Sequence, residues 1–433
     1  MPFSYFPPLG EQVWGNLDGD IERQDDLIDL IDEKTGEAEQ KQNLLINSNF
    51  SVWQRVATKL EVKSRERTSN LVTLETEVPH GYRTGDMVQI TNMGAGTYDE
   101  PSGTVIAKID DTHFSYTNTG GDESNTTELS GTCLLLERIS MVCGDGDFFA
   151  DRWLALNESS EPIATEDEGA KLTATASGKL GVMQIVPHRY LEQYLDSGLS
   201  LSIDVKSESA AKVKLALLTW EGNADEPNHD VVDSWNGVGA NPSLVTDWGY
   251  ESISDEVELS SEFQTLKLED ISVSTSANNI AIFLWIEGLS ADENIVINNA
   301  QIIEGSSYIT YKRGYYVDEV IKCLQFYKKS YSLADPPYKK TDEGKVSFAS
   351  SYGISNGNVV GTVHYCDMYK TPSVELISSA DPPVNDYWVV STGVNVGMAV
   401  DYENAKSFTV INDSGFSIST SSVGGHYVLD AEI

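Results

Sequence analysis

The sequence is poor in basic residues. It has 29 Lys and Arg against 67 Asp and Glu, which gives a formal net charge of −38. Such a field repels phosphate backbones and anionic membranes, so no nucleic-acid partner is expected. It also disfavours direct binding of anionic polysaccharide unless divalent cations bridge the two. The same acidity keeps a protein soluble in salty surroundings and does not identify a function by itself.

Cysteine and long apolar runs are also scarce. The four cysteines form no CxxC pair, and the six histidines are scattered, so we expect free structural thiols and no zinc site. The densest apolar run, Ile280 to Ile286, is far shorter than the ~20 residues of a membrane span. The first residues lack the basic and apolar regions of a signal peptide. We therefore expect a protein that is soluble as made, without membrane insertion.

Most of the chain from Asn43 onward has the pattern of β-strands. Segments such as SLSIDVKSES, AKVKLALLTW and NIVINNAQII alternate or run apolar, and Gly, Ser and Asn separate them. Regular short strands with turn signals favour an antiparallel sandwich. The expected fold class is mainly β: a sandwich with an inserted small β-barrel, a C-terminal β domain and a short N-terminal helix.

The first 42 residues differ from the rest. Residues 1–16 are rich in proline and carry Phe3, Tyr5, Phe6 and Trp14, which predicts an extended peptide lying on a partner protein.

Residues 17–42 contain a helical stripe in which Ile21, Gln24, Ile28 and Ile31 follow three- and four-residue steps. This stripe is typical of a short coiled coil, and a trimer is the expected oligomer. The alternative is a single helix packed on its own domain.

The sandwich is predicted to be split in sequence. Its opening strand lies in 43–55 and the remainder in 138–316, while residues 56–137 have their own strand and turn pattern. The intervening segment is long enough for a small β domain inserted into a loop of the larger one. A helix over 317–330 then links the sandwich to a C-terminal β domain, 331–433.

One candidate ligand site lies in the loop after AKVKLALLTW. Trp220, Trp235, Trp248 and Tyr250 fall within a stretch rich in Gly, Asn, Asp and Pro. Sugar rings stack on aromatic side chains, and Asn or Asp can bind their hydroxyls. The sequence therefore offers these residues as a glycan-binding site. The alternative is that the rings pack the loop onto its sheet or fill a subunit interface.

Two further groups invite a role. Asp145, Asp147 and Asp151 surround a glycine turn and could hold Ca²⁺, although a solvated acidic turn is the simpler interpretation. No other cofactor is expected. Trp53, Arg55, Asp151 and Trp153 are interpreted as structural, with core aromatics and an Arg–carboxylate pair that joins two strands.

Several motifs together resemble those of bacteriophage tail-fibre and related virion appendage proteins. They are NLLINSNFSVWQR, FFADRW, AQIIEGSSYITYKRGYYVDEVIKCLQFYKK and DAEI, and the sandwich they mark is similar to a jelly-roll carbohydrate-binding domain. The segment EVPHGYRTGD resembles small β domains that decorate phage structural proteins, with Glu77 departing from their first position. These motifs cover about half of the chain, and residues 220–260 depart from them freely.

The resemblance implies a non-enzymatic homotrimer in the virion, made in the host cytoplasm. Its N-terminus would bind other virion proteins, and its outer domains would attach to a host-surface glycan. The alternative is a purely structural appendage or adaptor. A glycan depolymerase is disfavoured, because no regular repeat of about 20 residues typical of a β-helix is present.

Overall fold

The computed structural model describes residues 41–433. Residues 56–59, 78–79, 81, 83, 95–97, 111, 128–130, 137–139, 159–160, 196, 210, 238–240, 334, 340, 350–353, 381–382, 384, 391–392, 416 and 418–421 are not described. The predicted docking peptide 1–16 and the predicted helix with Ile21, Gln24, Ile28 and Ile31 thus lie outside the described residues. No described helix is long and apolar enough to cross a membrane.

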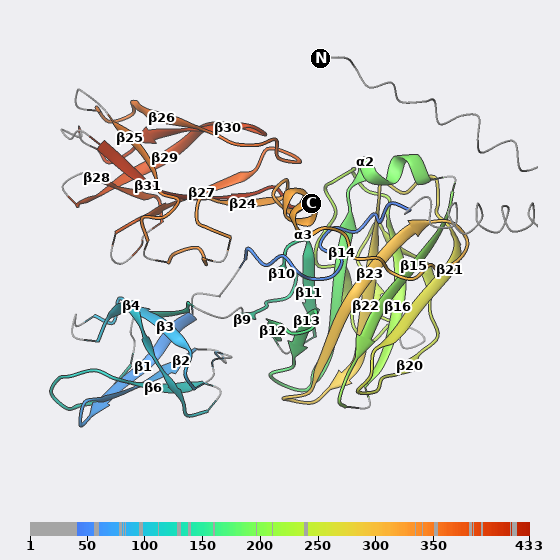
Figure 1. Ribbon diagram of the computed structural model, residues 1–433, viewed down its shortest axis with the longest axis horizontal. Helices are drawn as coiled ribbons and strands as arrows, with labels where there is room; N and C mark the ends of the chain where they lie inside the picture. Colours follow the sequence, from blue (N-terminus) through green and yellow to red (C-terminus); the bar gives the residue numbers. More distant parts are fainter. Residues whose placement is uncertain are drawn as a thin grey trace, which may run out of the picture. The chain divides into compact units, whose positions relative to one another are not determined.

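The largest part is a sandwich of two antiparallel sheets (Figure 1). The seven-stranded sheet runs β10 (Asp147–Ala150), β11 (Trp153–Asn157), β14 (Gly178–Val186), β22 (Asn279–Leu289), β16 (Lys212–Trp220) and β19 (Trp248–Ile253), with β20 (Val257–Glu258) also paired to β16. The six-stranded sheet runs β21 (Gln264–Ser272), β15 (Gly198–Lys206), β23 (Asn294–Glu304), β13 (Ala170–Thr173), β12 (Ile163–Glu166) and β9 (Ser140–Val142). The predicted fold class is confirmed.

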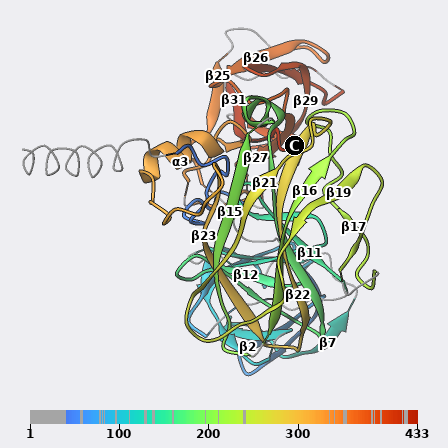
Figure 2. The same ribbon diagram turned by 90° about the vertical axis from the view of Figure 1, so that its right-hand side faces the viewer.

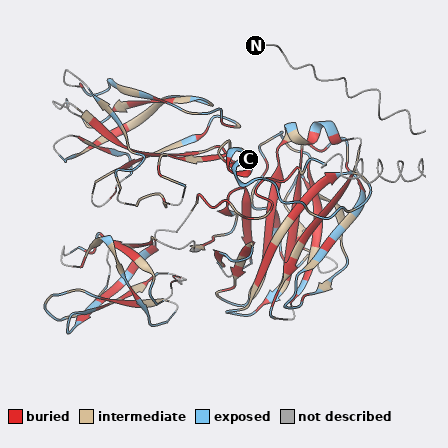
Figure 3. Cartoon of the chain, viewed as in Figure 1, coloured by how far each residue is buried: buried red, intermediate tan, exposed pale blue. Residues whose placement is uncertain are grey.

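The main core lies between these sheets. Alternate residues of β15 and of β23 point inward, and β14, β16 and β22 supply the opposite side of the same cluster. In Figure 3 the sandwich strands are largely buried, whereas many of the loops between them are exposed. The period-two alternation in β15 and β21 therefore reports the inner and outer faces of the sheet to which they belong.

The segment between Gln54 and β9 forms a small β domain. Its strands are β1 (Leu60–Thr68), β2 (Leu71–Thr76), β3 (Met87–Thr91), β4 (Glu100–Val105), β5 (Ala107–Lys108), β6 (His113–Thr117), β7 (Glu123–Thr127) and β8 (Thr132–Leu135). Because β1 pairs with β2, β7 and β8, the sheet curls around a core of its own, in which Val72, Leu74 and Phe114 are fully buried.

The C-terminal β domain is organised around its last strand. β31 (Ser422–Asp430) pairs with β24 (Tyr327–Lys329), β25 (Val346–Ala349), β27 (Ser373–Ser378) and β28 (Tyr387–Val390). The sheet continues through β29 (Asn395–Asn404), β30 (Ser407–Asn412) and β26 (Val359–His364). Trp388 is fully buried in its core.

Two local predictions were wrong in detail. The linking helix α3 covers only Tyr316–Cys323, because the chain turns at Leu324 and then joins the C-terminal sheet, where Tyr327 pairs with Asp430. The segment 43–55 is buried but forms no β-ladder. Asn47 and Phe50 there have φ of 53°, in the left-handed region, which interrupts an extended strand.

Four smaller elements belong to the sandwich. A short helix, α2 (His188–Leu191), follows β14 and continues into a 3₁₀ turn over Glu192–Tyr194. Strands β17 (Val232–Ser234) and β18 (Ser243–Leu244) pair within the long loop between β16 and β19. In Figure 2 the loop that carries β17 extends beside β16 and β19.

Candidate functional site

The aromatic side chains of the loop between β16 and β19, which were predicted to bind a ligand, form a second hydrophobic core. Trp220, Trp235 and Trp248 are each 7% exposed and pack with the outer face of the seven-stranded sheet. The indole N–H of Trp220 donates to the Asn223 carbonyl at 2.8 Å. That of Trp248 donates to a loop carbonyl as well, at 3.1 Å. Their burial leaves little ring surface for a sugar, and it agrees with the alternative interpretation that these rings pack the loop onto its sheet.

Tyr250 belongs to the same cluster. Its side chain is partly buried against the outer face, and its hydroxyl donates to the Pro242 carbonyl at 2.9 Å. Burial raises the pKa of this phenol. Both the ring and the hydroxyl are therefore engaged within the loop.

The three aspartates of the proposed calcium site point to separate partners. Asp145 accepts from the backbone N–H of Asn157 at 2.8 Å, and Asp147 accepts from that of Gly144 at 2.8 Å. Asp151 is fully buried and faces Gln54. Among the residues that the structure describes, no group of three or more His, Cys, Asp or Glu side chains could hold a metal ion.

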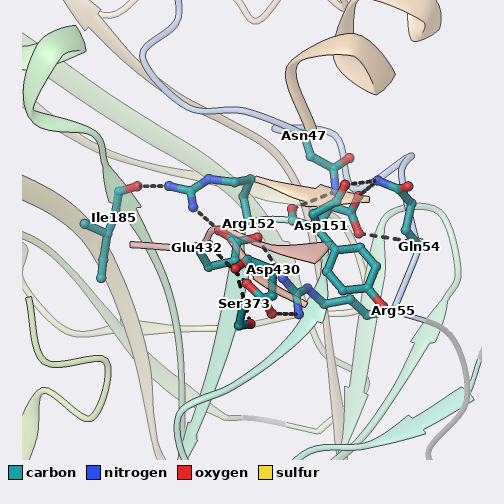
Figure 4. A network of polar contacts seen from close by, with 10 residues as sticks. Asn47, Gln54, Arg55, Asp151, Arg152, Ile185, Ser373, Asp430 and Glu432 are labelled. Carbon is teal, nitrogen blue, oxygen red and sulfur yellow. Dashed lines mark hydrogen bonds and ion pairs between the residues drawn. The ribbon is translucent and has the colours of Figure 1, made fainter. Parts of the chain in front are cut away.

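Asp151 instead organises the buried segment that precedes the inserted domain (Figure 4). Its carboxylate accepts from the backbone N–H of Gln54 at 3.0 Å and from the side-chain amide at 2.5 Å. The side-chain amide of Asn47 donates to the Asp151 carbonyl at 3.1 Å. Burial raises the pKa of Asp151 to about 6, while Arg55 and Gln54 partly oppose the shift.

Arg55 does not pair with Asp151 as the sequence suggested. Its guanidinium bonds to Asp430, the last residue of β31, at 2.8 Å and to Glu432, just beyond that strand, at 3.1 Å. Glu432 also pairs with Arg152, whose side chain is 1% exposed and donates to the Ile185 carbonyl at 2.7 Å. A buried Arg–Glu–Arg group thus joins the end of the C-terminal sheet to the sandwich.

The other two residues of that predicted group are core aromatics. Trp53 and Trp153 are 5% and 0% exposed and lie in the main core. Their indole N–H groups donate to the carbonyls of Phe50 and Asn47, respectively. These rings hold the irregular segment 43–55 against the sandwich.

A cavity of about 700 Å³ lies beside this network. Phe148, Tyr327 and Tyr338 contribute rings to it, and Arg55 lies over two of them, 4.8 Å from the Phe148 centroid and 4.0 Å from that of Tyr327. Because the Arg55 charge is already bonded to two carboxylates, it is not free for a ligand. This cavity is therefore a weaker candidate than the groove described next.

A polar groove of about 680 Å³ opens beside the six-stranded sheet. We call it the Phe263 groove. Its lining comes from residues 49–51, the turn between β12 and β13, the end of β15, residues 261–263 before β21, the middle of β23, and Arg313. The groove therefore gathers short pieces of chain that lie far apart in the sequence.

A bulge in β23 shapes the groove. Asn299 has φ of 49°, and the β15–β23 register shifts between Ser202 and Asp204. The Asn299 side-chain amide donates to Asp204 at 2.9 Å, and that of Asn298 donates to the Glu168 carbonyl at 2.6 Å. The bulge thus turns two successive amide side chains toward the groove and fixes them there.

Gly169 allows the opposite wall to approach. It has φ of +141°, and a Cβ placed on it would lie 2.2 Å from the Ile297 carbonyl oxygen. Only glycine lets the β12–β13 turn pack this closely on β23. This close approach places Glu166, at the end of β12, and Glu168, in the turn, along the groove.

Phe263 supplies the exposed ring of the groove. Its side chain is 39% exposed, and the Lys206 ammonium lies 4.6 Å from the ring centroid. Lys206 also pairs with Glu168, so that lysine is held between a carboxylate and an aromatic ring. The groove therefore combines an accessible aromatic ring with fixed amides and charged groups.

Phe263, Glu166 and Lys206 were not among the site residues predicted from the sequence. A signal was present: Phe263 is a lone aromatic in the polar stretch SSEFQT, just before the alternating strand β21. Glu166 carries no such signal, because carboxylates are abundant. Arg313 lies in the quoted motif AQIIEGSSYITYKRGYYVDEVIKCLQFYKK, but its meeting with distant segments depends on the fold.

Known proteins offer limited comparison. No family model matches the chain, and no curated protein matches it. Similar solved structures include a family 11 carbohydrate-binding module from Clostridium thermocellum in complex with a mixed-linked tetrasaccharide. It is 15% identical with a TM-score of 0.23, and the match covers 39% of this chain and 98% of that one.

Two further solved structures show similar levels of likeness. A carbohydrate-binding module of the β-sandwich superfamily is 9% identical with a TM-score of 0.25, over 57% of this chain and 98% of that one. The enzymatically active domain of bacteriophage CBA120 tailspike protein 4 is 11% identical with a TM-score of 0.23, over 35% and 19%. Values this low establish neither a shared family nor a shared ligand.

Proposed function

We propose that this protein binds a glycan in the Phe263 groove. The observation that carries the proposal is an open polar groove in which an exposed ring lies beside fixed amide side chains. Sugar rings have apolar C–H faces that stack on aromatic rings, and hydroxyls that bind amides and carboxylates. The groove offers both kinds of contact on a rigid sandwich.

The wider role that we propose is attachment within a phage tail-fibre-type appendage. The motif resemblance supports it, together with the predicted helix and apolar peptide in the first 42 residues. In this proposal the chain is a homotrimer in the virion, and residues 1–16 bind another virion protein. Three copies of a weak glycan site would then act together through effective concentration. Adhesion of this kind needs no catalytic group.

A purely structural appendage is the second candidate. The observation in its favour is the burial of Trp220, Trp235 and Trp248, which removes the aromatic surface that the sequence suggested for a ligand. The two candidates differ in one property: only the first requires the Phe263 groove to bind saccharide.

The test is a glycan-array and host-envelope binding assay with the full-length protein and Phe263→Ala. We expect binding by the parent protein and a loss of roughly tenfold or more in the variant, because stacking and ring burial are both removed. The matched control is Tyr402→Ala, since Tyr402 is also an exposed aromatic, at 72%, but lies in β29. Absence of saccharide binding by the folded parent protein would leave the structural appendage.

Oligomerisation has its own test. Light scattering of the full-length protein should give the mass of a trimer, and Ile28→Asp should reduce it to that of a monomer, because a charge in the predicted seam opposes association. A parent protein that is already monomeric would contradict the trimer without affecting the glycan site.

A further inference from the structure

The solvent-facing side of α3 is apolar. Tyr315, just before the helix, is 83% exposed, and Val317 and Ile321 within it are 63% and 54% exposed. Val317 and Ile321 are four residues apart, so they lie on one face of the helix. Tyr316 adds a half-exposed ring at the first helical position. We call these four residues the α3 surface. Several large apolar side chains exposed side by side are typical of an interaction surface.

The opposite side of α3 is fixed to the sandwich. Val320 and Cys323 are buried in a cluster that includes Ile46. The Glu319 carboxylate accepts from the backbone N–H of Asn47 at 2.7 Å. In Figure 2 the helix lies at one edge of the described part of the chain. Turning the α3 surface inward would remove the buried side chains from their cluster, so the exposed side needs cover from outside the chain.

The chain enters the sandwich beside α3. Ile46, which packs with Val320, is only four residues after residue 42, where the predicted oligomerisation segment 17–42 ends. Four extended residues span at most about 14 Å. A coiled coil over 17–42 holds the same point of each copy near a common axis. The α3 helices of the copies are then tethered near that axis as well.

Charge also favours this surface for contact between copies. A chain of net charge −38 repels further copies of itself wherever its acidic residues gather. Residues 311–328 are an exception, with four basic against two acidic side chains: Lys312, Arg313, Lys322 and Lys328 against Asp318 and Glu319. Copies can therefore approach one another at α3 with less repulsion than the composition of the whole chain would impose.

We infer that the α3 surface contacts the same surface of the other copies at the three-fold axis, which extends the subunit interface beyond residues 17–42. This inference rests on the proposed homotrimer and names a contact within it. Four side chains are far fewer than the roughly 20 to 30 residues per partner in a stable interface, so this contact supplements the coiled coil. Because the coiled coil raises the effective concentration of the copies, the contact needs little affinity of its own.

Val317→Asp tests the contact without disturbing the helix. Val317 lies in the first turn of α3, where the helix dipole favours an acidic side chain. Analytical ultracentrifugation of the full-length protein over a concentration series measures dissociation of the trimer. The variant should raise the concentration of half-dissociation by roughly tenfold or more, because apolar burial is lost and like charges meet at the axis.

The matched control for this variant is Val394→Asp. Val394 is also an exposed valine, but it lies between β28 and β29 in the C-terminal β domain. Its variant should dissociate at the same concentration as the parent protein. Circular dichroism of both variants, compared with the parent protein, checks that the fold is kept.

Crosslinking locates the contact directly. Cys366 is the one exposed cysteine among the four described, so it is first replaced by serine. On that background, Val317→Cys should give covalent dimers with a short bismaleimide, because the thiols of neighbouring copies lie close together at the axis. Val394→Cys, treated in the same way, should remain uncrosslinked.

The results separate this contact from the trimer and from the glycan site. If the parent protein is a trimer but Val317→Asp leaves its dissociation unchanged, or Val317→Cys does not crosslink, the α3 contact is wrong and the trimer stands. If the parent protein is monomeric at every concentration, the trimer and the α3 contact both fail. Calorimetry with soluble oligosaccharides measures the Phe263 groove independently, because each site binds such a probe on its own.

Discussion

The two outer faces of the sandwich differ in what covers them. The outer face of the seven-stranded sheet carries apolar side chains, among them Met183, Phe283 and Trp285, and the loop between β16 and β19 covers it. On the six-stranded sheet, Asp204 and Asn299 lie at the bulge that shapes the open groove. An apolar face must be buried, whereas a polar face can remain open to a ligand. The rings most evident in the sequence therefore stabilise the fold, and the inferred ligand contacts lie on the opposite sheet.

The largest expected effect comes from opening the covered face. Trp248→Ala should lower the free energy of unfolding by about 3 to 5 kcal/mol, because a large buried ring is replaced by a cavity between the loop and the sheet. Urea denaturation followed by tryptophan fluorescence measures the change. A loss below about 0.5 kcal/mol, the usual size for a surface substitution, would show that the loop covers the sheet only loosely.

The next largest effect on stability concerns the buried ion pair that links the sandwich to the residues at the end of β31. Glu432→Ala should cost about 3 kcal/mol, because Arg152 is left as a buried charge without its carboxylate. The double variant Arg152→Met/Glu432→Leu should regain much of this loss, since it removes both charges. Equal destabilisation in the single and double variants would mean that the loss in free energy of unfolding comes from packing at this contact and not from charge.

A smaller effect should appear as a pH dependence. The pKa of Asp151 is about 6 in the folded protein, above the value of about 3.9 for an unfolded chain, so folding favours its protonated form. The contribution of Asp151 to the free energy of unfolding is fully present below pH 4 and is lost as pH rises through 6. The free energy of unfolding of Asp151→Asn should therefore vary less between pH 4 and pH 6.5 than that of the parent protein.

The nearby Asp430 titrates in the opposite sense. Its pKa is lowered below the usual value, with burial opposed by the larger combined effect of Arg55 and backbone hydrogen bonding. The stability that Asp430 contributes is lost as pH falls. Asp430 is present in both the parent protein and the Asp151→Asn variant. The difference between parent and Asp151→Asn curves thus isolates Asp151. Parallel curves would contradict the raised pKa.

The smallest effect on stability should come from the open face. Phe263→Ala should change the free energy of unfolding by less than about 0.5 kcal/mol, because the ring is already 39% exposed and few contacts are lost. Denaturation of this variant beside Trp248→Ala sharpens the contrast between the two faces. A large destabilisation would assign Phe263 a packing role and weaken its use as a binding residue.

Much of the fold could be predicted from the sequence. Alternation in strands such as β15 and β21 and the continuous apolar run of β22 identify a sandwich whose sheets are buried to different degrees. The apolar run of β22 also indicates the structural role of the loop tryptophans. Since β22 is buried on both faces, something must cover its outer side, and the neighbouring loop with its tryptophans is the nearest cover.

The candidate site was much harder to predict. Glu166, Phe263 and Arg313 lie on three separate segments, and only the sheet pairings bring them to one groove. The bulge at Asn299 depends on a single left-handed residue, for which asparagine is suitable but not diagnostic. Helix α3 ended early for a comparable reason: pairing of Tyr327 with β31 competes with helix continuation, and that partner lies about a hundred residues away.

The buried pair of Arg152 and Glu432 sets an order of events during synthesis. Its members are 280 residues apart in the chain, so the arginine leaves the ribosome long before its carboxylate exists. At typical elongation rates this interval lasts roughly 15 to 60 s. Until then the sandwich holds two arginines without their shared counter-charge. This part of the molecule therefore reaches its final state only after β31 and Glu432 have been synthesised.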